Sequence, residues 1–267
     1  MDNQEIKSHI NYAIPAKSHT PMYLIHKWWA RKPHNVVAEY IEKYSKKGDI
    51  ILDPFCGSGV TNAESLRLKR KTVGFDIDPI ATFITRMTIT YADLKKIEKA
   101  FKIIEVKVKK DIEKLYETKC PSCGKNALAL ATIWDRDKNQ ELEIRLYCPY
   151  CDDKHRKKPD EYDIKKLQSI EKTTINYWYP KDKLYYENGR PFKKKEINEQ
   201  ISDLFTKRAL IALSRIYHEI ETIEIDELTR DFLKFSFTSR VHIASNMGPV
   251  AKPSPRSHWT EDSTTSF

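Results

Sequence analysis

A chain of 267 residues, 40% of them hydrophobic, is long enough for one sizeable core with a small second module beside it. No run of eighteen apolar residues occurs and the first residues lack the pattern of a signal peptide, so we expect no membrane span and a cytoplasmic, soluble protein. Lysine and arginine (47) outnumber aspartate and glutamate (38), which favours a polyanionic partner but is also compatible with mere solubility.

The amino-terminal part predicts a helix, a strand, a glycine loop, a second helix and a second strand. Residues 35–45 carry an apolar helical face made of Val36, Val37, Tyr40, Ile41 and Tyr44. Residues 50–52 predict a short strand buried on both faces, a helix is expected after Gly59, and residues 72–76 predict the second strand. This order is the opening of a doubly wound, Rossmann-like α/β fold.

The composition and the hydrophobic pattern change several times along the rest of the chain. Residues 80–117 have helical composition, 128–134 and 142–147 predict two strands, and 154–195 predict an irregular connection. Helices are expected from about residue 197 to 220 and from Asp226, as the N-cap, to about 237. The Pro- and Ser-rich tail after Met247 is expected to be disordered.

The glycines indicate where a ligand binds. The chain has only seven, yet Gly57 and Gly59 stand two residues apart in Asp53-Pro54-Phe55-Cys56-Gly57-Ser58-Gly59-Val60-Thr61, directly after the first strand. Such a pair lets the backbone turn tightly, and the following helix presents unpaired N–H groups. Asp76 ends the next strand, where a carboxylate can accept hydrogen bonds from two ribose hydroxyls. The pairing indicates an adenosine-containing cofactor.

Other interpretations of the loop fit less well. A nicotinamide site would have a third glycine where Asn62 stands, and a phosphate-binding P-loop would need Gly-Lys-Ser/Thr. A tight turn without a ligand stays open as an alternative.

These residues resemble the cofactor-binding region of the amino-group DNA methyltransferases, which modify N6 of adenine or N4 of cytosine. The likeness covers residues 23–82 and includes Arg31-Lys32-Pro33, the segment 48–59 and the segment 71–78. It implies S-adenosylmethionine as the cofactor and DNA as the partner. Lys32 and Pro33 would border the methionine end, and Asp76 would hold the ribose. The expected cofactor site comprises Lys32, Pro33, Asp53, Pro54, Phe55, Gly57, Gly59, Thr61, Asp76 and Ile77.

The segment before Lys32 is basic and aromatic. His26, Trp28 and Trp29 would form a wall of the cofactor or target-base pocket, or one tryptophan would pack in the core while the other covers a loop. Cys56 lies inside the cofactor loop, where a small residue is required. Because the chain has no Pro-Cys dipeptide, methylation of cytosine C5 is disfavoured.

Four of the five cysteines form a C-x2-C, 24-residue spacer, C-x2-C arrangement: Cys120, Cys123, Cys148 and Cys151. Two thiolate pairs on turns can close a tetrahedral Zn2+ site, and four sulfur ligands leave no position for a catalytic water. We expect a structural zinc ribbon. The knuckles and the segment 203–208 are similar to the zinc-ribbon-containing adenine-specific methylases, which favours adenine N6 as the acceptor. Whether the basic ribbon contacts DNA stays open.

Amino-methyltransferases also need an Asp/Asn/Ser-Pro-Pro-Tyr/Phe motif that holds the target base. The 267 residues contain only Asp53-Pro54-Phe55, already assigned to the cofactor, and Ser254-Pro255-Arg256. We therefore expect no catalytic residue in this chain, which would be the amino-terminal, cofactor-binding part of an interrupted or split enzyme, with a second polypeptide as a possible source of the motif.

Four parts are expected: a cofactor-binding core (1–117), the zinc ribbon (118–155), a connector with helices (156–247) and the tail (248–267). A zinc-ribbon nucleic-acid-binding subunit without catalysis and an RNA methyltransferase stay open as alternatives. The sequence does not decide between adenine and cytosine, nor does it reveal the recognition sequence or the oligomeric state.

Overall fold

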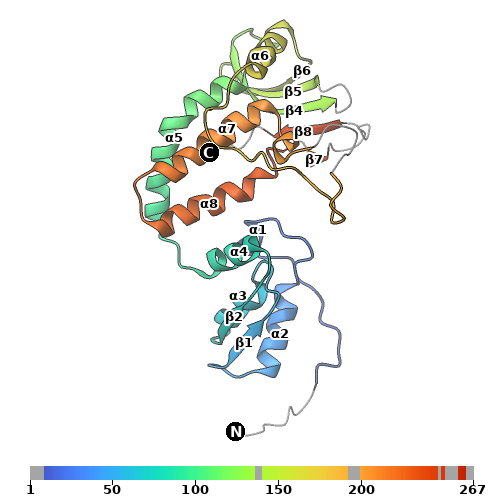
Figure 1. Ribbon diagram of the computed structural model, residues 1–267, viewed down its shortest axis with the longest axis vertical. Coiled ribbons are helices and arrows are strands. Elements are labelled where there is room, and N and C mark those ends of the chain that lie inside the picture. Colours follow the sequence, from blue (N-terminus) through green and yellow to red (C-terminus); the bar gives the residue numbers. More distant parts are fainter. Residues whose placement is uncertain (1–8, 136–139, 192–198, 246–247, 250–257, 263–267) are drawn as a thin grey trace. The chain divides into compact units, whose positions relative to one another are not determined.

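The computed structural model describes residues 9–135, 140–191, 199–245, 248–249 and 258–262 (Figure 1). The chain divides into two compact units, Met1–Asp93 and Leu94–Phe267. The first contains the glycine loop and the second contains the four paired cysteines. The division lies inside the expected 1–117 core, because the helix that follows Asp93 packs with the second unit.

The first unit has the expected order of elements around two strands. Its elements are α1 (Pro21–Leu24), α2 (His34–Tyr44), β1 (Ile50–Asp53), α3 (Val60–Arg67), β2 (Lys71–Gly74) and α4 (Pro79–Ile89). β1 and β2 are parallel, with Asp53 opposite Gly74. Because both strands end at the same edge, the loop that follows β1 and the acid that follows β2 come together there.

Within the described part of the first unit, side chains cover only one face of the two-strand sheet. Ile50 and Leu52 are 66% and 61% exposed, and Val73 and Phe75 on the same face are 42% and 60% exposed. The prediction that residues 50–52 are buried on both faces is therefore wrong. Side chains alternate along a strand, so α3, which packs on the sheet, covers only every second residue.

The core of the first unit lies on the helical side. Tyr23, Val60 and Ala63 form a buried cluster against which Val37 packs. On α2 the buried residues are Ala38 and Ile41, whereas the predicted apolar face is only partly buried: Tyr40 and Tyr44 stack on each other near the surface, with ring centroids 5.9 Å apart.

The second unit combines helices with an antiparallel sheet. Its helices are α5 (Leu94–Tyr116), α6 (Glu161–Glu171), the 3-10 helix η1 (Ile201–Leu204), α7 (Lys207–Thr222) and α8 (Glu227–Val241). Its strands are β3 (Glu117–Lys119), β4 (Asn126–Asp135), β5 (Gln140–Cys148), β6 (Asp153–Lys157), β7 (Gly248–Pro249) and β8 (His258–Asp262). The sheet order is β6-β5-β4-β8-β7, and β3 also pairs with β4.

Among its described residues, two apolar clusters contribute to the packing of this unit. The first packs α5 against α7 and α8 through residues such as Ile104, Val108 and Ile216. The second lies on the sheet and includes Leu146 and Cys148, both fully buried. Together they stabilise the helices and the strands as one body.

Arg208 joins α7 to the sheet. Its side chain is 7% exposed and donates hydrogen bonds to Glu141 (3.0 Å) and to Thr132 (3.2 Å). Its guanidinium group also lies 4.8 Å from the ring centroid of Tyr116. A charge buried so deeply needs such partners, and the ion pair with Glu141 supplies the opposite charge.

Helix boundaries agree with the sequence where a capping residue was recognised. α8 begins after Asp226, whose carboxylate accepts the N–H of Thr229 at 3.0 Å, as predicted. The helix expected from residue 197 begins only at Lys207, because Thr206 accepts the N–H of Ala209 and caps α7 there. Residues 192–198 lie outside the described part.

Regular elements occupy both segments that were expected to lack them, and β6 and α6 lie in the predicted connection. α6 begins with a capping box between Asp160 and Asp163, inside the predicted connection. In the tail, β8 pairs with β4 and with β7, while 250–257 and 263–267 lie outside the described residues. Across the described ranges, no helix combines the length and apolar character needed to cross a membrane.

Candidate cofactor site and metal centre

The loop between β1 and α3 has a backbone that only glycine adopts easily. Gly57 and Gly59 have φ values of +52° and +78°. The N–H of Gly59 donates to the carbonyl of Cys56 (2.8 Å), and the N–H of Cys56 donates to the carbonyl of Phe75 (2.8 Å). The loop is thereby fixed both to itself and to the chain after β2. α3 then begins at Val60 without a side-chain cap.

Space around Gly59 is as restricted as its conformation. A Cβ atom there would lie 2.7 Å from Oγ1 and 3.0 Å from Cα of Thr85. The Thr85 hydroxyl donates to the Gly57 carbonyl at 3.0 Å. α4, which carries Thr85, therefore supports the loop from outside.

Asp76 holds the loop directly. One carboxylate oxygen accepts the N–H of Gly57 at 2.8 Å and the other accepts the N–H of Asp78 at 3.0 Å. Hydrogen bonds from the backbone of Asp78 and of Gly57 lower the pKa of this carboxyl group. An ionised carboxylate has about four lone-pair sites, so this half-buried side chain retains acceptor capacity for further donors.

The structure brings several of the expected cofactor residues to this edge of the sheet. Asp53, Gly57 and Gly59 lie in or at the loop, with Thr61 in the first turn of α3 and Asp76 after β2. Asp53 accepts the N–H of Phe55 at 3.1 Å.

The remaining expected residues are more peripheral. The side chains of Phe55 and Ile77 are 84% and 99% exposed, and Lys32 and Pro54 are exposed as well. Pro33 precedes α2 as its N-cap residue.

Arg31 connects the segment before α2 to the loop, a role that the sequence did not indicate. Its guanidinium group donates to the backbone carbonyls of Tyr23 and His26 and, at 3.0 Å, to the hydroxyl of the buried Ser58. Burial lowers the pKa of Arg31. These contacts span up to 27 residues of sequence, so no local pattern could have predicted them.

A second buried contact reinforces this connection. The Tyr23 hydroxyl donates to Glu64 on α3 at 2.7 Å, and both residues are 2% exposed. Arg67 donates to the other oxygen of Glu64 at 2.6 Å. Burial and the hydrogen bond to Glu64 raise the pKa of Tyr23, which stays a neutral donor.

The two neighbouring tryptophans have different surroundings. Trp28 lies against the loop: a Cβ on Gly57 would be 3.0 Å from its Nε1 atom. Trp29 is 78% exposed, with the Lys27 ammonium 4.5 Å from its ring centroid. Only Trp28 is therefore positioned at the glycine loop.

Cys56 is a structural residue of the loop. Its side chain is buried, the Thr85 hydroxyl lies 3.6 Å from its sulfur, and desolvation raises the pKa of the thiol. A thiol that keeps its proton is a weak nucleophile. The geometry agrees with the interpretation that this position needs a small side chain.

The second unit brings the four paired cysteines together. The sulfur atoms of Cys120, Cys123, Cys148 and Cys151 all lie within 4.8 Å of one another. The Cys120–Cys151 and Cys123–Cys148 distances are 3.8 and 3.6 Å. A tetrahedral Zn2+ with bonds of about 2.3 Å requires sulfur atoms roughly 3.8 Å apart. The donor set and its spacing therefore fit a four-thiolate metal ion.

Electrostatics around the cysteines also favour a cation. Desolvation opposes ionisation of Cys120, but hydrogen bonds from the N–H groups of Cys123 and Ser122 and from the thiols of Cys148 and Cys123 together lower the pKa of this thiol to about 6. The pKa of Cys151 is instead raised to about 12, first by its hydrogen bond with Cys123. Four close thiols repel each other's negative charge, so all four ionise only around a cation.

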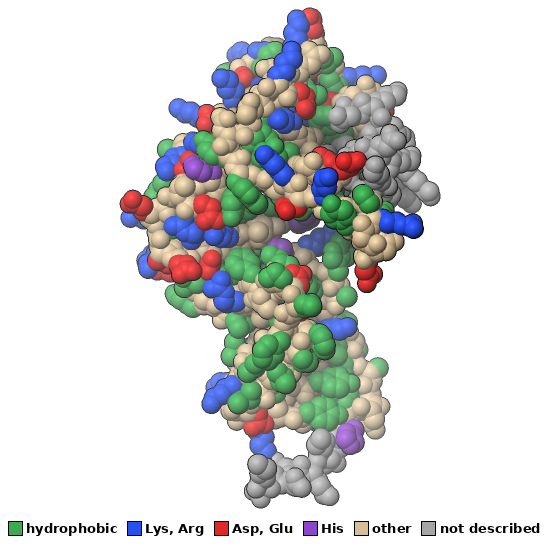
Figure 2. All heavy atoms as spheres, viewed as in Figure 1, with side chains coloured by type: hydrophobic (Ala, Val, Ile, Leu, Met, Phe, Trp, Pro, Cys, Tyr) green, Lys and Arg blue, Asp and Glu red, His purple; other side chains and the backbone are tan. Residues whose placement is uncertain are grey.

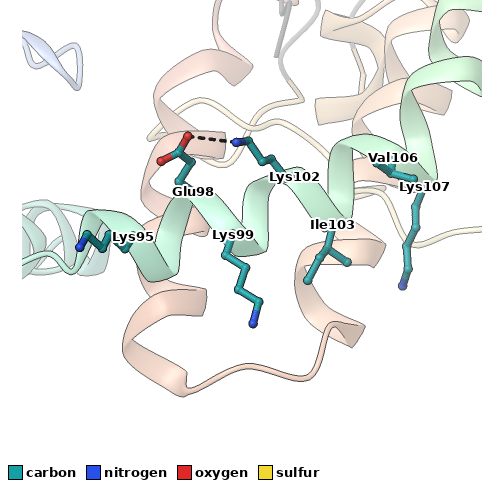
Figure 3. Close-up of a pocket in the computed structure, with 7 residues that line it drawn as sticks. All are labelled: Lys95, Glu98, Lys99, Lys102, Ile103, Val106 and Lys107. Atoms are coloured by element: carbon teal, nitrogen blue, oxygen red, sulfur yellow. Dashed lines mark ion pairs between the residues drawn. The ribbon is translucent and has the colours of Figure 1, made fainter.

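A hollow of about 700 Å³ runs along α5 (Figure 3). It is a weaker candidate for a ligand-binding site than the glycine loop or the cysteine cluster. Lys99, Ile103 and Lys107 point to one side of the helix, and Glu98 pairs with Lys102 at 3.3 Å on the other. Lys107 in turn pairs with Glu219 at 2.9 Å. On the face shown in Figure 2, basic and acidic side chains are interspersed. This pattern is typical of a solvated helix face.

The geometry of the first unit defines a class before any comparison is made. Parallel strands joined through a glycine loop and a helix, with an acid after the second strand, are typical of α/β proteins that bind an adenosine-containing cofactor. Residues 6–86 match the family model described as DNA methylase, N6_N4_Mtase. This segment is therefore similar to DNA methylases, which supports the resemblance to the amino-group DNA methyltransferases drawn from the sequence.

Individual relatives carry related names. The chain is 31% identical to the type II methyltransferase M.BsoBI of Geobacillus stearothermophilus over 133 residues, covering 45% of this chain and 26% of that protein. It is 29% identical to M.MjaII of Methanocaldococcus jannaschii over 75 residues, covering 28% of this chain and 14% of that one. It is 39% identical to M.MjaI of the same organism over 46 residues, covering 17% and 15%.

The matched region thus spans about a quarter or less of each of these relatives. No solved structure matches the chain.

Proposed function

We propose that this chain binds S-adenosylmethionine as the cofactor part of a DNA methyltransferase that acts on an exocyclic amino group. The observation that carries the proposal is the Asp76 carboxylate bound to the Gly57 N–H, at the edge where β1 and β2 both end. This contact joins the two halves of the motif that the sequence suggested, the loop and the acid.

The chemistry of the loop fits this cofactor. The carboxylate of Asp76 is ionised at neutral pH and would accept the ribose hydroxyls through its remaining lone pairs. The amino end of α3 and the glycine backbone would border the amino acid and sulfonium region, as the family resemblance implies. When bound, the cofactor would supply an activated methyl group. The protein would bind it, orient it and exclude water.

We further propose that the four-cysteine cluster holds a structural Zn2+. The ion would order the knuckles and the strands β4 and β5 that lead into them. Four sulfur ligands leave no coordination site for water, so the proposed role is stabilisation and not hydrolysis.

The acceptor is the least constrained part. Likeness to the zinc-ribbon methylases favours adenine N6 over cytosine N4. Mass spectrometry of nucleosides from DNA methylated by any preparation containing this chain would separate N6-methyladenine from N4-methylcytosine. Since the 267 residues lack a Pro-Pro-Tyr or Pro-Pro-Phe motif, we propose that this chain alone transfers no methyl group and that another segment or polypeptide supplies the motif.

Calorimetric titration of the purified chain with S-adenosylmethionine tests the cofactor proposal. We expect saturable binding, weakened roughly 10- to 100-fold in Asp76→Ala by loss of charge-assisted hydrogen bonds. Asp49→Ala is the matched control, because this acid accepts the N–H of Lys46 in a turn before β1. Absence of binding by the unaltered chain would contradict the proposal.

A separate assay tests the missing motif. The chain is incubated with mixed-sequence DNA and S-adenosylmethionine labelled on its methyl group, and we expect no label in the DNA. Robust incorporation would show that the acceptor site lies within these 267 residues. It would leave the cofactor proposal intact.

A further inference from the structure

The indole of Trp28 lies against the glycine loop, although the glycine motif does not require a tryptophan there. Its Nε1, Cε2 and Cζ2 atoms would lie 3.0, 3.4 and 3.6 Å from a Cβ on Gly57, so the nitrogen-bearing edge of the ring contacts the bare backbone. The side chain is half-buried, which leaves part of the ring accessible. An aromatic ring that rests on the loop and is still partly open forms a wall beside it.

Arg31 holds the segment that carries this ring. It donates to the carbonyls of Tyr23 and His26, on the amino-terminal side of Trp28, and to Ser58, the residue after Gly57. The segment that carries the indole and the loop beneath it are thus held by one side chain. A lysine could replace the charge but not three hydrogen bonds in a planar fork.

We propose that Trp28 is a specificity-determining residue of the cofactor pocket that recognises the positive charge of the sulfonium, and that Arg31 is the positioning residue that holds it. This inference rests on the proposed function, since it takes S-adenosylmethionine as the ligand. The physical basis is attraction between a cation and the electron-rich face of an aromatic ring, for which tryptophan is the strongest. Trp29, exposed and paired with Lys27, has no such role.

Calorimetry with two ligands tests the role of Trp28. S-adenosylmethionine carries the sulfonium charge, whereas S-adenosylhomocysteine has a neutral thioether. We expect Trp28→Leu to weaken binding of the charged ligand by roughly five- to thirtyfold, and binding of the neutral ligand much less. Trp28→Phe should keep part of the preference, and Trp29→Leu, the matched control, should change neither affinity.

Fluorine NMR of the full chain labelled with 5-fluorotryptophan tests the role of Arg31. The chain has five tryptophans, and the Trp28 resonance is assigned by its disappearance in Trp28→Phe. We expect S-adenosylmethionine to shift this resonance. Arg31→Lys and Ser58→Ala should shift or broaden it without ligand, while the resonances of Trp134, Trp178 and Trp259 in the other unit stay in place. The unchanged resonances would show that the rest of the fold is retained.

The outcomes separate the inference from the function on which it rests. If the unaltered chain binds neither ligand, both are wrong. If it binds both but Trp28→Leu loses them equally or not at all, the charge-recognition role of Trp28 is wrong and the cofactor proposal stands. A Trp28 resonance indifferent to Arg31→Lys would overturn the positioning role.

Discussion

Gly59 is the residue at which both the conformation and the space of the cofactor loop are fixed. Its φ of +78° lies where side chains other than glycine's are strained, and Thr85 occupies the position that a Cβ would take. Gly48, with a φ of +92°, has the same conformational demand but nothing within 4 Å of its Cβ position. A comparison of alanine substitutions at the two glycines therefore separates the effect of backbone strain from that of steric overlap.

We expect Gly59→Ala to lower the free energy of unfolding by about 2–5 kcal/mol, the sum of left-handed strain and overpacking against Thr85. Gly48→Ala should lower it by only about 1–2 kcal/mol, because strain alone acts there. Urea denaturation measures both values. Equal losses at the two positions would mean that Thr85 yields to the added methyl group.

Asp76 makes the loop geometry sensitive to pH in a defined direction. Hydrogen bonds from Asp78 and Gly57 lower its pKa in the folded chain below the ordinary value of 3.8. The contribution of the ionised carboxylate is therefore complete above the ordinary value and is lost as the pH falls through the lower, folded value. The Gly57 amide resonance should thus titrate with a midpoint below 3.8. A midpoint at or above that value would show that the carboxylate does not hold the loop.

The sequence predicted the loop residues but not what surrounds them. Gly57, Gly59 and Asp76 are recognisable because a tight turn after a strand and an acid after the next strand are local patterns. Arg31 contacts Ser58 across 27 residues, and Trp28 lies against Gly57, 29 positions along the chain. Neither Arg31 nor Trp28 belongs to a periodic pattern or a motif with fixed spacing. The sequence therefore did not decide which of the two tryptophans lies at the pocket.

At the scale of elements, the cysteine knuckles join the carboxyl end of β5 to the turn before β4. We expect one Zn2+ per chain, lost in Cys148→Ser, and expect chelation to unfold the β4–β5 region, because the four thiolates cannot share this space without a cation. Metal analysis with circular dichroism checks this. Cys56→Ser, in the other unit, should keep its zinc, and full zinc occupancy in Cys148→Ser would contradict the assignment.

The ion pair that anchors α7 gives a second test at this scale. Glu141 is 4% exposed and pairs with Arg208 at 3.0 Å. Arg208→Met should therefore lower the free energy of unfolding by about 3–5 kcal/mol, because it removes the positive charge that pairs with the buried Glu141 carboxylate. The double variant Arg208→Met, Glu141→Leu should recover much of that loss. Denaturant unfolding of both measures the difference, and a double variant as unstable as the single one would contradict this account.

Element boundaries were predictable where caps were read and not elsewhere. Asp226 caps α8 as expected, whereas Thr206 caps α7 about ten residues after the predicted start of that helix. The capping box at Asp160 and Asp163 was a local signal that could have predicted α6. The many charged residues around α6 were interpreted as an irregular connection, although charge alone does not distinguish a helix from a loop.

At the scale of the whole molecule, the first unit presents an apolar sheet face. Strands of doubly wound sheets are normally buried on both faces, yet Leu52 and Phe75 remain about as exposed as surface residues. The sequence could not predict this, because an apolar run does not state what covers it. The order of elements predicted an α/β fold. The match of residues 6–86 to the DNA methylase family model covers the segment that contains the glycine loop and Asp76.

A crystal structure of the chain grown with S-adenosylmethionine would show whether the glycine loop and Asp76 form the cofactor site. We expect the ligand at the edge where β1 and β2 end, with its ribose hydroxyls on Asp76 and its methionine portion along Gly57 and Gly59. A ligand bound elsewhere, with the Asp76 carboxylate turned away from the loop, would contradict this expectation.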